Sequence, residues 1–353
     1  MNVGTAIELL LDGHHLSRED ARELMGSIMD GEETPARIAG FLVAHRSAYE
    51  RRLRNVALRA RGETADEIAG FAEAMREHVV PVTPQRSPLV DVVGTGGDGA
   101  GTFNISTAAA LVAAAAGAAV AKHGNRAASS AAGSADVLEE LGIGVEQSPE
   151  RTARSIDELG FGFMFARTHH PAMRHVAAVR QELGIRTVFN VLGPLTNPAG
   201  ACDGVFGVYA AYLAPSYAAA LAELGSRRAF VVHGAGGLDE LSPCGTSLVV
   251  EVVDGDVHEW ELDPRDLGID PTDPEELRGG SAAQNAATIR SVFAGERGGR
   301  RDAVLLNAAG ALVAAGLAAD LGEGLALGGE AIDSGAVMQR LDALVAYSAE
   351  DPG

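Results

Sequence analysis

The segment from Val90 to Arg126 constrains the fold of this chain more than any other. It reads as an apolar strand, the glycine-rich run Gly94-Thr-Gly-Gly-Asp98-Gly-Ala-Gly, an alanine-rich helix, a second strand and the basic turn Lys122-His-Gly-Asn-Arg126. Strand, loop, helix and strand in this order predict a βαβ unit of a parallel sheet. Such a unit presents backbone N–H groups and a helix N-terminus at the carboxyl end of the strands, which suits a phosphate group.

The glycine run fits two known phosphate motifs poorly. Gly94, Gly96 and Gly99 match the dinucleotide fingerprint, but Asp98 puts a carboxylate inside the loop, and Lys122 stands near the position where a ribose-binding acid is expected. No Gly-Lys-Ser/Thr follows the glycines, which excludes a Walker loop. A carboxylate beside a phosphate requires a metal ion between them, so the run predicts a phosphate loop with a bridging cation.

Polar residues after the loop extend this interpretation. Asn104, Ser106 and Thr107 offer oxygens for Mg²⁺ or hydrogen bonds for phosphate, and Lys122 offers a point charge. The alternative is a structural glycine turn capped by Asn104 or Ser106. Polar residues at two successive strand ends favour a functional site.

Composition excludes several classes of protein. The 353 residues carry 28 basic and 48 acidic side chains, a net charge of −20, which argues against nonspecific binding of nucleic acid or anionic membranes. The two cysteines, Cys202 and Cys244, form no zinc-binding pattern. The N-terminus lacks the pattern of a secretory signal, and the most apolar run, Ala108 to Ala121, is shorter than the ~20 residues of a membrane span. We therefore expect a cytoplasmic protein without a membrane partner.

The pattern along the chain predicts a small all-helical N-terminal domain and a large α/β domain with a mostly parallel central sheet. Helices are predicted to begin at Ser17, Thr34 and Thr64. From about Leu89 strands alternate with helices, and Asp254-Gly255 predicts a hairpin. The helical domain comprises residues 1–70 and a returning segment near 168–190, and the α/β domain comprises 71–167 and 191–353. The predicted strands are Leu89–Val93, Ala118–Lys122, Phe161–Ala166, Val205–Tyr209, Arg228–His233, Thr246–Val253 and Val257–Leu262, and further helices are predicted at Pro171–Leu183 and Asp302–Ala318.

Three further segments are candidates for substrate or metal contacts. His170 and Arg180 lie ten residues apart, so the predicted helix would place them on one face, where Arg180 could pair with a substrate carboxylate or simply be exposed. The turn containing Gly193 and Pro194 is either a pocket wall or a structural loop. Asp239-Glu240 follows a predicted strand and a glycine-rich loop. With Ser106, this acidic pair could clamp one or two Mg²⁺ ions on a pyrophosphate.

Taken in order, these motifs resemble those of anthranilate phosphoribosyltransferases over nearly the whole chain. The resemblance implies a homodimer formed through the helical domain, with anthranilate and phosphoribosyl pyrophosphate as substrates and Mg²⁺, two ions, as cofactor. It assigns catalytic roles to Asp98, Lys122, Asp239 and Glu240, and metal binding to Ser106, Asp239 and Glu240. The residues that it implies for phosphoribosyl pyrophosphate are Gly94, Gly97, Asp98, Thr102, Asn104, Ser106, Thr107, Lys122 and Ser134, and those for anthranilate are Gly94, Asn125, His170, Arg180, Gly193 and Pro194.

The chain departs from the family pattern at two places. Ala131-Ala132 stands where a basic residue and a serine are usual, and Arg167 stands where proline is usual. Arg126 is a candidate to compensate on the phosphate side. Two other functions compete. The first is a pyrimidine nucleoside phosphorylase of the same architecture, but those enzymes have a serine-containing loop where Gly-Asn-Arg follows Lys122-His123 here. The second is a noncatalytic paralogue that binds nucleic acid or nucleotides, which the net charge opposes.

Overall fold

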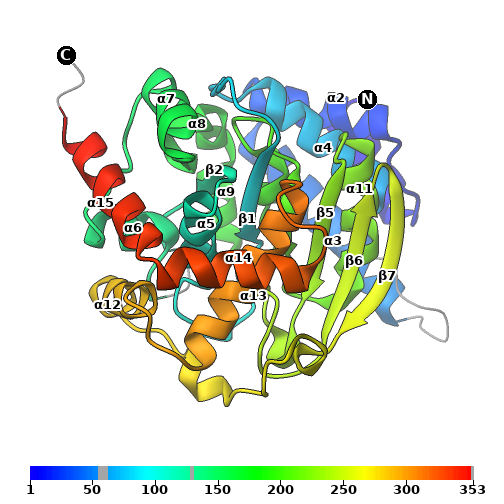
Figure 1. Cartoon of the computed structure of the whole chain (residues 1–353). Helices are drawn as coiled ribbons and strands as arrows, with labels where there is room; N and C mark the ends of the chain where they lie inside the picture. Colours follow the sequence, from blue (N-terminus) through cyan, green and yellow to red (C-terminus); the bar gives the residue numbers. More distant parts are fainter. Residues whose placement is uncertain (55–62, 128–130, 351–353) are drawn as a thin grey trace.

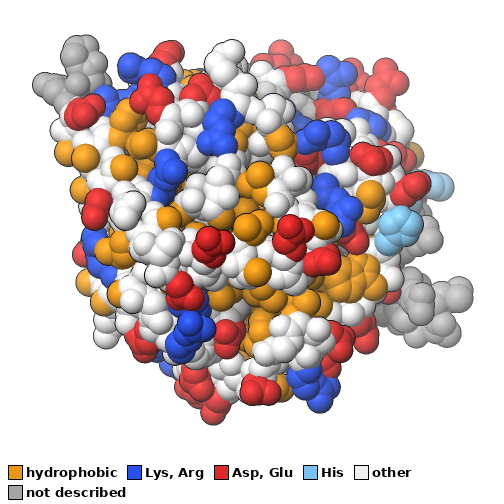
Figure 2. All heavy atoms as spheres, viewed as in Figure 1, with side chains coloured by type: hydrophobic (Ala, Val, Ile, Leu, Met, Phe, Trp, Pro, Cys, Tyr) orange, Lys and Arg blue, Asp and Glu red, His pale blue; other side chains and the backbone are white. Residues whose placement is uncertain are grey.

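The computed structural model describes residues 1–54, 63–127 and 131–350, with side chains described only to residue 47 in the first of these ranges. A seven-stranded sheet stands between helices on both faces, and a bundle formed mainly by N-terminal helices lies at one side (Figure 1). Acidic and basic side chains are interspersed over the face drawn in Figure 2. In the described part of the chain, no helix is long and apolar enough to cross a membrane.

The sheet confirms the predicted mostly parallel architecture. Its order is β3-β2-β1-β4-β5-β6-β7. The first five strands in this order run parallel, and the last two pairings, β5 with β6 and β6 with β7, are antiparallel. Every predicted strand is present, with ends shifted by at most two residues. The strands are β1 (Leu89–Gly94), β2 (Ala119–Gly124), β3 (Phe161–Phe165), β4 (Asp203–Gly207), β5 (Arg228–His233), β6 (Ser247–Val253) and β7 (Asp256–Leu262).

The β6–β7 hairpin turns at the predicted dipeptide. Asp254 and Gly255 both have positive φ, 48° and 92°. Two consecutive residues with positive φ match the twist of the flanking strands, and Asp and Gly tolerate that conformation better than other residues. The local sequence therefore specifies this connection.

The N-terminal helices begin at the predicted caps. In α2 (Arg18–Met29), the Ser17 side chain accepts a hydrogen bond from the Asp20 N–H, and Thr64 forms a capping box with Glu67 at the start of α4 (Ala65–Glu77). With α1 (Val3–Leu11) and α3 (Pro35–Arg54), these helices share a core with α11 (Ala214–Glu223) and one face of the sheet. The predicted domain boundary at residue 70 falls inside α4.

The predicted helix over Pro171–Leu183 is wrong at its start. A short helix α8 (Ala166–His169) ends before Pro171, a 3-10 turn (η1, Pro171–Met173) follows, and α9 (Arg174–Leu183) then packs against α2 and α3. Proline disfavours a helical conformation in the residue before it, and His170 has φ −118° and ψ 65°. His170 and Arg180 therefore do not share a continuous helix face.

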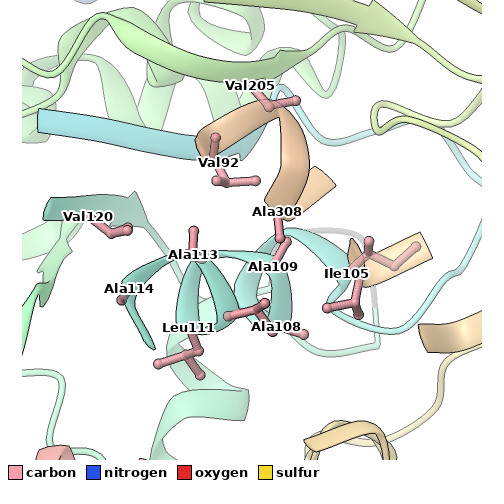
Figure 3. Close-up of a cluster of buried hydrophobic side chains, with 14 of the residues drawn as sticks. Val92, Ile105, Ala108, Ala109, Leu111, Ala113, Ala114, Val120, Val205 and Ala308 are labelled. Carbon is pink, nitrogen blue, oxygen red and sulfur yellow. The ribbon is translucent and has the colours of Figure 1, made fainter. Parts of the chain in front are cut away.

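Small side chains pack the helices closely on the sheet. The alanines of α5 (Ile105–Ala115) and Ala308 of α13 (Gly299–Ala314) lie beneath Val92, Val120 and Val205 of three neighbouring strands (Figure 3). A Cβ atom at Gly310 of α13 would lie 2.6 Å from Val205 Cγ2, so α13 rests directly on β4. The remaining helices are α6 (Ser134–Glu140), α7 (Pro149–Leu159), α10 (Phe189–Leu192), α12 (Ala282–Phe293), α14 (Leu321–Asp333) and α15 (Ala336–Ala349), with 3-10 turns η2 (Gly193–Thr196), η3 (Ala211–Leu213), η4 (Ala235–Gly237), η5 (Pro264–Leu267) and η6 (Pro274–Leu277).

Candidate active site at the carboxyl edge of the sheet

The glycine loop between β1 and α5 is held at both ends by backbone hydrogen bonds. Thr95 N–H donates to Gly207 O at 2.9 Å, and Phe103 N–H donates to Leu277 O at 2.9 Å. Between these anchors Gly96, Gly97, Gly99 and Gly101 all have φ between 66° and 77°. Four left-handed residues in six explain the glycine spacing, because other residues adopt this conformation at a cost.

Asn104 does not act as a simple helix cap. It occupies the N-cap position of α5 without a side-chain capping bond. Its amide instead donates to Ala132 O at 3.1 Å and accepts from Asn285 Nδ2 at 2.9 Å. The Asn104 side chain therefore ties the start of α5 to two distant segments, which the capped-turn interpretation did not predict.

Three carboxylates meet beside the glycine loop. One oxygen from each of Asp98, Asp239 and Glu240 lies within 4.8 Å of the other two. Asp239 Oδ2 accepts a hydrogen bond from the Gly96 N–H at 2.6 Å. Residues 143 positions apart in the chain thus form one cluster, as expected for motifs that follow parallel strands of the same sheet.

Glycines at three strand ends make room for the segment that carries two of these carboxylates. A Cβ atom at Gly94 would lie 2.2 Å from Asp239 Oδ2, and one at Gly207 would lie 1.5 Å from Asp239 O. At Gly234, just after β5, a Cβ atom would lie 2.3 Å from Glu240 O. The Asp239-Glu240 segment therefore crosses directly over the ends of β1, β4 and β5.

The far side of this segment is held by a buried asparagine of α13. Asn307 accepts a hydrogen bond from the Leu241 N–H and donates to Leu241 O, both at 2.9 Å. Its side chain is fully buried. Asn307 was not among the predicted site residues, because nothing local in the sequence marks this position of an apolar helix as part of the site.

Burial and mutual repulsion raise the pKa values of two carboxyl groups in the cluster. Burial, followed by repulsion from Asp98, raises the pKa of Asp239 to about 6. Burial and repulsion from Asp239 and Asp98 raise the pKa of Glu240 well above its usual value. Glu240 Oε2 is buried without a hydrogen-bond partner among the described residues. Oxygen ligands in this arrangement fit a hard divalent cation such as Mg²⁺.

Lys122 is buried near Glu240 of this cluster rather than exposed in the loop. Its side chain is 1% exposed, and its ammonium donates to Val92 O at 2.6 Å. Burial lowers the pKa of Lys122, while the nearby Asp91 and Glu240 oppose that shift. In this structure Lys122 offsets buried negative charge, and its predicted contact with phosphate stays a prediction.

Two buried histidines form a second group near the cluster. His170 Nε2 lies 3.2 Å from His123 Nε2, and His123 Nδ1 lies 3.1 Å from Gly193 O. Burial lowers the pKa of His123 to about 3 and that of His170 to about 4, so both rings are neutral near pH 7. No role was predicted for His123 itself, although it stands between Lys122 and Asn125 in the basic turn.

Arg180 has a cationic group without an acidic partner. Its guanidinium lies over the Phe189 ring at 5.3 Å and is half-buried, and burial lowers its pKa. Among the described residues its guanidinium makes no hydrogen bond or ion pair. A guanidinium that lies on an aromatic ring and has no acidic partner suits an aromatic carboxylate as ligand.

Other residues predicted for the site follow β2 or open α5. Ser134 Oγ donates to Asn125 O at 3.2 Å, Thr102 forms a β-bridge with Arg278, and Thr107 Oγ1 is buried without a partner among the described residues. Ser106 is half-buried in the first turn of α5. Arg126, in contrast, already forms ion pairs with Asp136 and Glu139 at 3.0 and 2.6 Å. Its guanidinium is therefore engaged and is not available to replace the basic residue that Ala131-Ala132 lacks.

Comparison with known proteins decides the family. Residues 86–338 match the family described as "Glycosyl transferase family, a/b domain", and residues 5–51 and 55–79 match its helical bundle domain. Anthranilate phosphoribosyltransferase of Anaeromyxobacter dehalogenans is 51% identical over 341 residues, covering 97% of each chain. The chain belongs to the anthranilate phosphoribosyltransferase family.

Solved structures of the family share the fold over nearly the full length. The enzyme from Thermus thermophilus is 49% identical, with a TM-score of 0.88 over 98% of this chain and 99% of that one. The Saccharomyces cerevisiae enzyme in complex with phosphoribosyl pyrophosphate and Mg is 28% identical, with a TM-score of 0.86 over 98% of both chains. Another structure of the yeast enzyme contains 4-fluoroanthranilate, with a TM-score of 0.83, 27% identity and coverage of 98% and 97%.

Proposed function

We propose that this chain transfers the phosphoribosyl group of phosphoribosyl pyrophosphate to the amine of anthranilate. The products are N-(5-phosphoribosyl)anthranilate and pyrophosphate, and the reaction is the second step of tryptophan synthesis from chorismate. The observation that supports it most is the meeting of Asp98, Asp239 and Glu240 beside the glycine loop, because a cation site and a phosphate site then share one edge of the sheet. The family membership agrees with this assignment.

We propose that the glycine loop and the start of α5 bind phosphoribosyl pyrophosphate. Free N–H groups of a left-handed glycine loop and of a helix N-terminus favour phosphate oxygens. The contacts proposed for this substrate are Gly94, Gly97, Asp98, Thr102, Asn104, Ser106, Thr107, Lys122 and Ser134.

We propose that Ser106, Asp239 and Glu240 hold two Mg²⁺ ions. The unpartnered, buried Glu240 Oε2 and the raised pKa values of both carboxyl groups support this assignment. Bound Mg²⁺ would neutralise charge that develops on the leaving pyrophosphate. Asp98 lies within the same cluster and would act on the ions directly or through water.

For the acceptor, we propose a pocket bounded by Gly94, Asn125, His170, Arg180, Gly193 and Pro194. Arg180 would pair with the carboxylate of anthranilate and so orient its amine. An aromatic amine is a weak nucleophile, so the reaction depends on early departure of the leaving group and an oxocarbenium-like transition state. The role of the chain is then alignment of the amine and electrostatic stabilisation, without a covalent nucleophile.

The test is loss of anthranilate fluorescence on addition of phosphoribosyl pyrophosphate, with and without Mg²⁺. We expect rapid loss that requires Mg²⁺. No loss in a folded sample would refute the proposal, and turnover of thymidine with phosphate would instead indicate a nucleoside phosphorylase. A homodimer formed through the helical domain, the cytoplasmic location and the division at residues 70, 168 and 190 stay predictions; size-exclusion chromatography with light scattering tests the first.

A further inference from the structure

The Arg186 side chain reaches the glycine loop from a segment far away in the sequence. It lies in the short connection between α9 and α10, after Gly184, which ends α9 with φ 58°. Its Nη2 donates a hydrogen bond to Gly97 O. No role was predicted for Arg186, because nothing in the local sequence indicates that this connection returns to the loop.

The backbone around Arg186 is anchored on both sides. Arg46 Nη1 of the helical bundle donates to Arg186 O at 3.2 Å, and the next residue, Thr187, donates its N–H to Asn190 Oδ1 at 2.9 Å. These two hydrogen bonds hold the backbone from which the Arg186 side chain extends.

The Arg186 guanidinium is also oriented by an aromatic ring. It lies over the Tyr209 ring with 4.4 Å between Cζ and the ring centroid. The Tyr209 N–H in turn donates to Thr95 Oγ1 at 3.1 Å, at the first residue of the same loop. Stacking on a ring leaves the edge of a guanidinium free to donate hydrogen bonds in the plane.

Exposure, together with the lack of an acidic partner among the described residues, distinguishes Arg186 from the other cations of the site. Lys122 is buried and hydrogen-bonded to Val92 O of β1, Arg126 pairs with two carboxylates and Arg180 is half-buried on Phe189. Arg186 is exposed, and within the described residues it has no acidic partner. Its present acceptor is a neutral carbonyl of the phosphate loop.

We propose that Arg186 binds the pyrophosphate group of phosphoribosyl pyrophosphate and positions it as the leaving group. This inference rests on the proposed function. A hydrogen bond from guanidinium to phosphate is about twice as strong as one to a neutral carbonyl, so a pyrophosphate in the loop would displace Gly97 O as the acceptor. The three clustered carboxylates and a polyanionic substrate need cationic partners beyond the metal ions, and Arg186 is placed to be one.

The test compares Arg186→Ala and Arg186→Lys with Arg174→Ala, a matched exposed arginine at the start of α9. Calorimetric titrations use phosphoribosyl pyrophosphate, pyrophosphate or ribose 5-phosphate, each with Mg²⁺ and without anthranilate. In Arg186→Ala we expect the first two ligands to bind about tenfold to a hundredfold more weakly. We expect ribose 5-phosphate affinity and the anthranilate KM to change less than twofold. Arg186→Lys should recover part of the loss, because lysine keeps the charge but not the bidentate fork.

Three results separate the possible failures. If all three ligands weaken equally in Arg186→Ala and its melting temperature falls, Arg186 merely anchors the loop and the inference is overturned. Unchanged pyrophosphate binding in Arg186→Ala, with the wild type active on anthranilate, overturns the inference and leaves the proposed function standing. If the wild type neither binds phosphoribosyl pyrophosphate nor consumes anthranilate, both proposals fall.

Discussion

Replacing Gly207 with alanine should displace the carboxylate cluster without altering any proposed substrate contact. A Cβ atom at this position would lie 1.5 Å from Asp239 O and 2.3 Å from its carbonyl carbon. Side-chain rotation cannot relieve a clash with backbone, and Cβ contacts under 3.0 Å essentially do not occur. The Asp239 backbone must therefore retreat by about 1.5 Å or β4 must shift.

Both responses displace Asp239 relative to the end of β4. A misplacement of about 1 Å in a reacting constellation can cost about a hundredfold in rate, so we expect kcat/KM for phosphoribosyl pyrophosphate to fall by about a hundredfold or more. Overpacking of this kind destabilises by about 1–3 kcal/mol. The folded state should persist, with a lower melting temperature.

The assay follows anthranilate fluorescence at several Mg²⁺ concentrations, together with thermal unfolding by circular dichroism. Gly26→Ala is the matched control, because among the described residues nothing lies within 4 Å of a Cβ atom at that helical position. Helix propensity predicts that Gly26→Ala is neutral or stabilises by up to about 1 kcal/mol. Activity of Gly207→Ala within twofold of wild type would refute the claim that close approach of Asp239 to β4 is needed for function.

Three further predictions follow from the geometry. Joint replacement Asp239→Ala and Glu240→Ala should lower kcat by about a hundredfold or more while changing the anthranilate KM much less; equal turnover would exclude the metal role. Arg180→Ala should raise the anthranilate KM about tenfold to a hundredfold, and an unchanged value would place the carboxylate contact elsewhere. Burial opposes ionisation of Glu67, but hydrogen bonds and nearby histidines outweigh it and hold its pKa at about 2, against 4.5 for the ordinary side chain. Glu67→Gln should therefore reduce the free energy of unfolding at pH 7 by up to about 3 kcal/mol. In urea denaturation this difference should persist above pH 4.5 and shrink as pH falls toward 2, and a difference that stays constant with pH would contradict the assignment.

Local patterns were enough to predict most elements of the fold. Strand ends were predicted within two residues because apolar runs are bounded by glycines and polar turns, and the Asp254-Gly255 turn has the positive φ values that those residues favour. The start of the helix predicted over Pro171–Leu183 was wrong, because Pro171–Met173 form a 3-10 turn and Pro171 keeps His170 out of a helical conformation.

The candidate site was predicted in its residue types but not in its layout. The sequence alone indicated a glycine loop, a basic turn and an acidic pair at strand ends, since parallel strands bring their carboxyl ends to one edge. It did not indicate on which side of β2 Lys122 would lie. In a strand buried on both faces, no alternation of polar residues marks which side faces the site. In the structure the Lys122 ammonium donates a hydrogen bond to Val92 O of the neighbouring strand.

What the sequence determined by itself was the set of elements, the parallel sheet and the chemistry offered at its edge, because caps, turns and hydrophobic runs act over a few residues. Tertiary structure alone decided the approach of Asp239 to Gly94 and Gly207, the pairing of His123 with His170 and the return of Arg186 to Gly97. These contacts join residues tens to more than a hundred positions apart. They depend on how helices and strands pack as bodies, and no local pattern of residues encodes that.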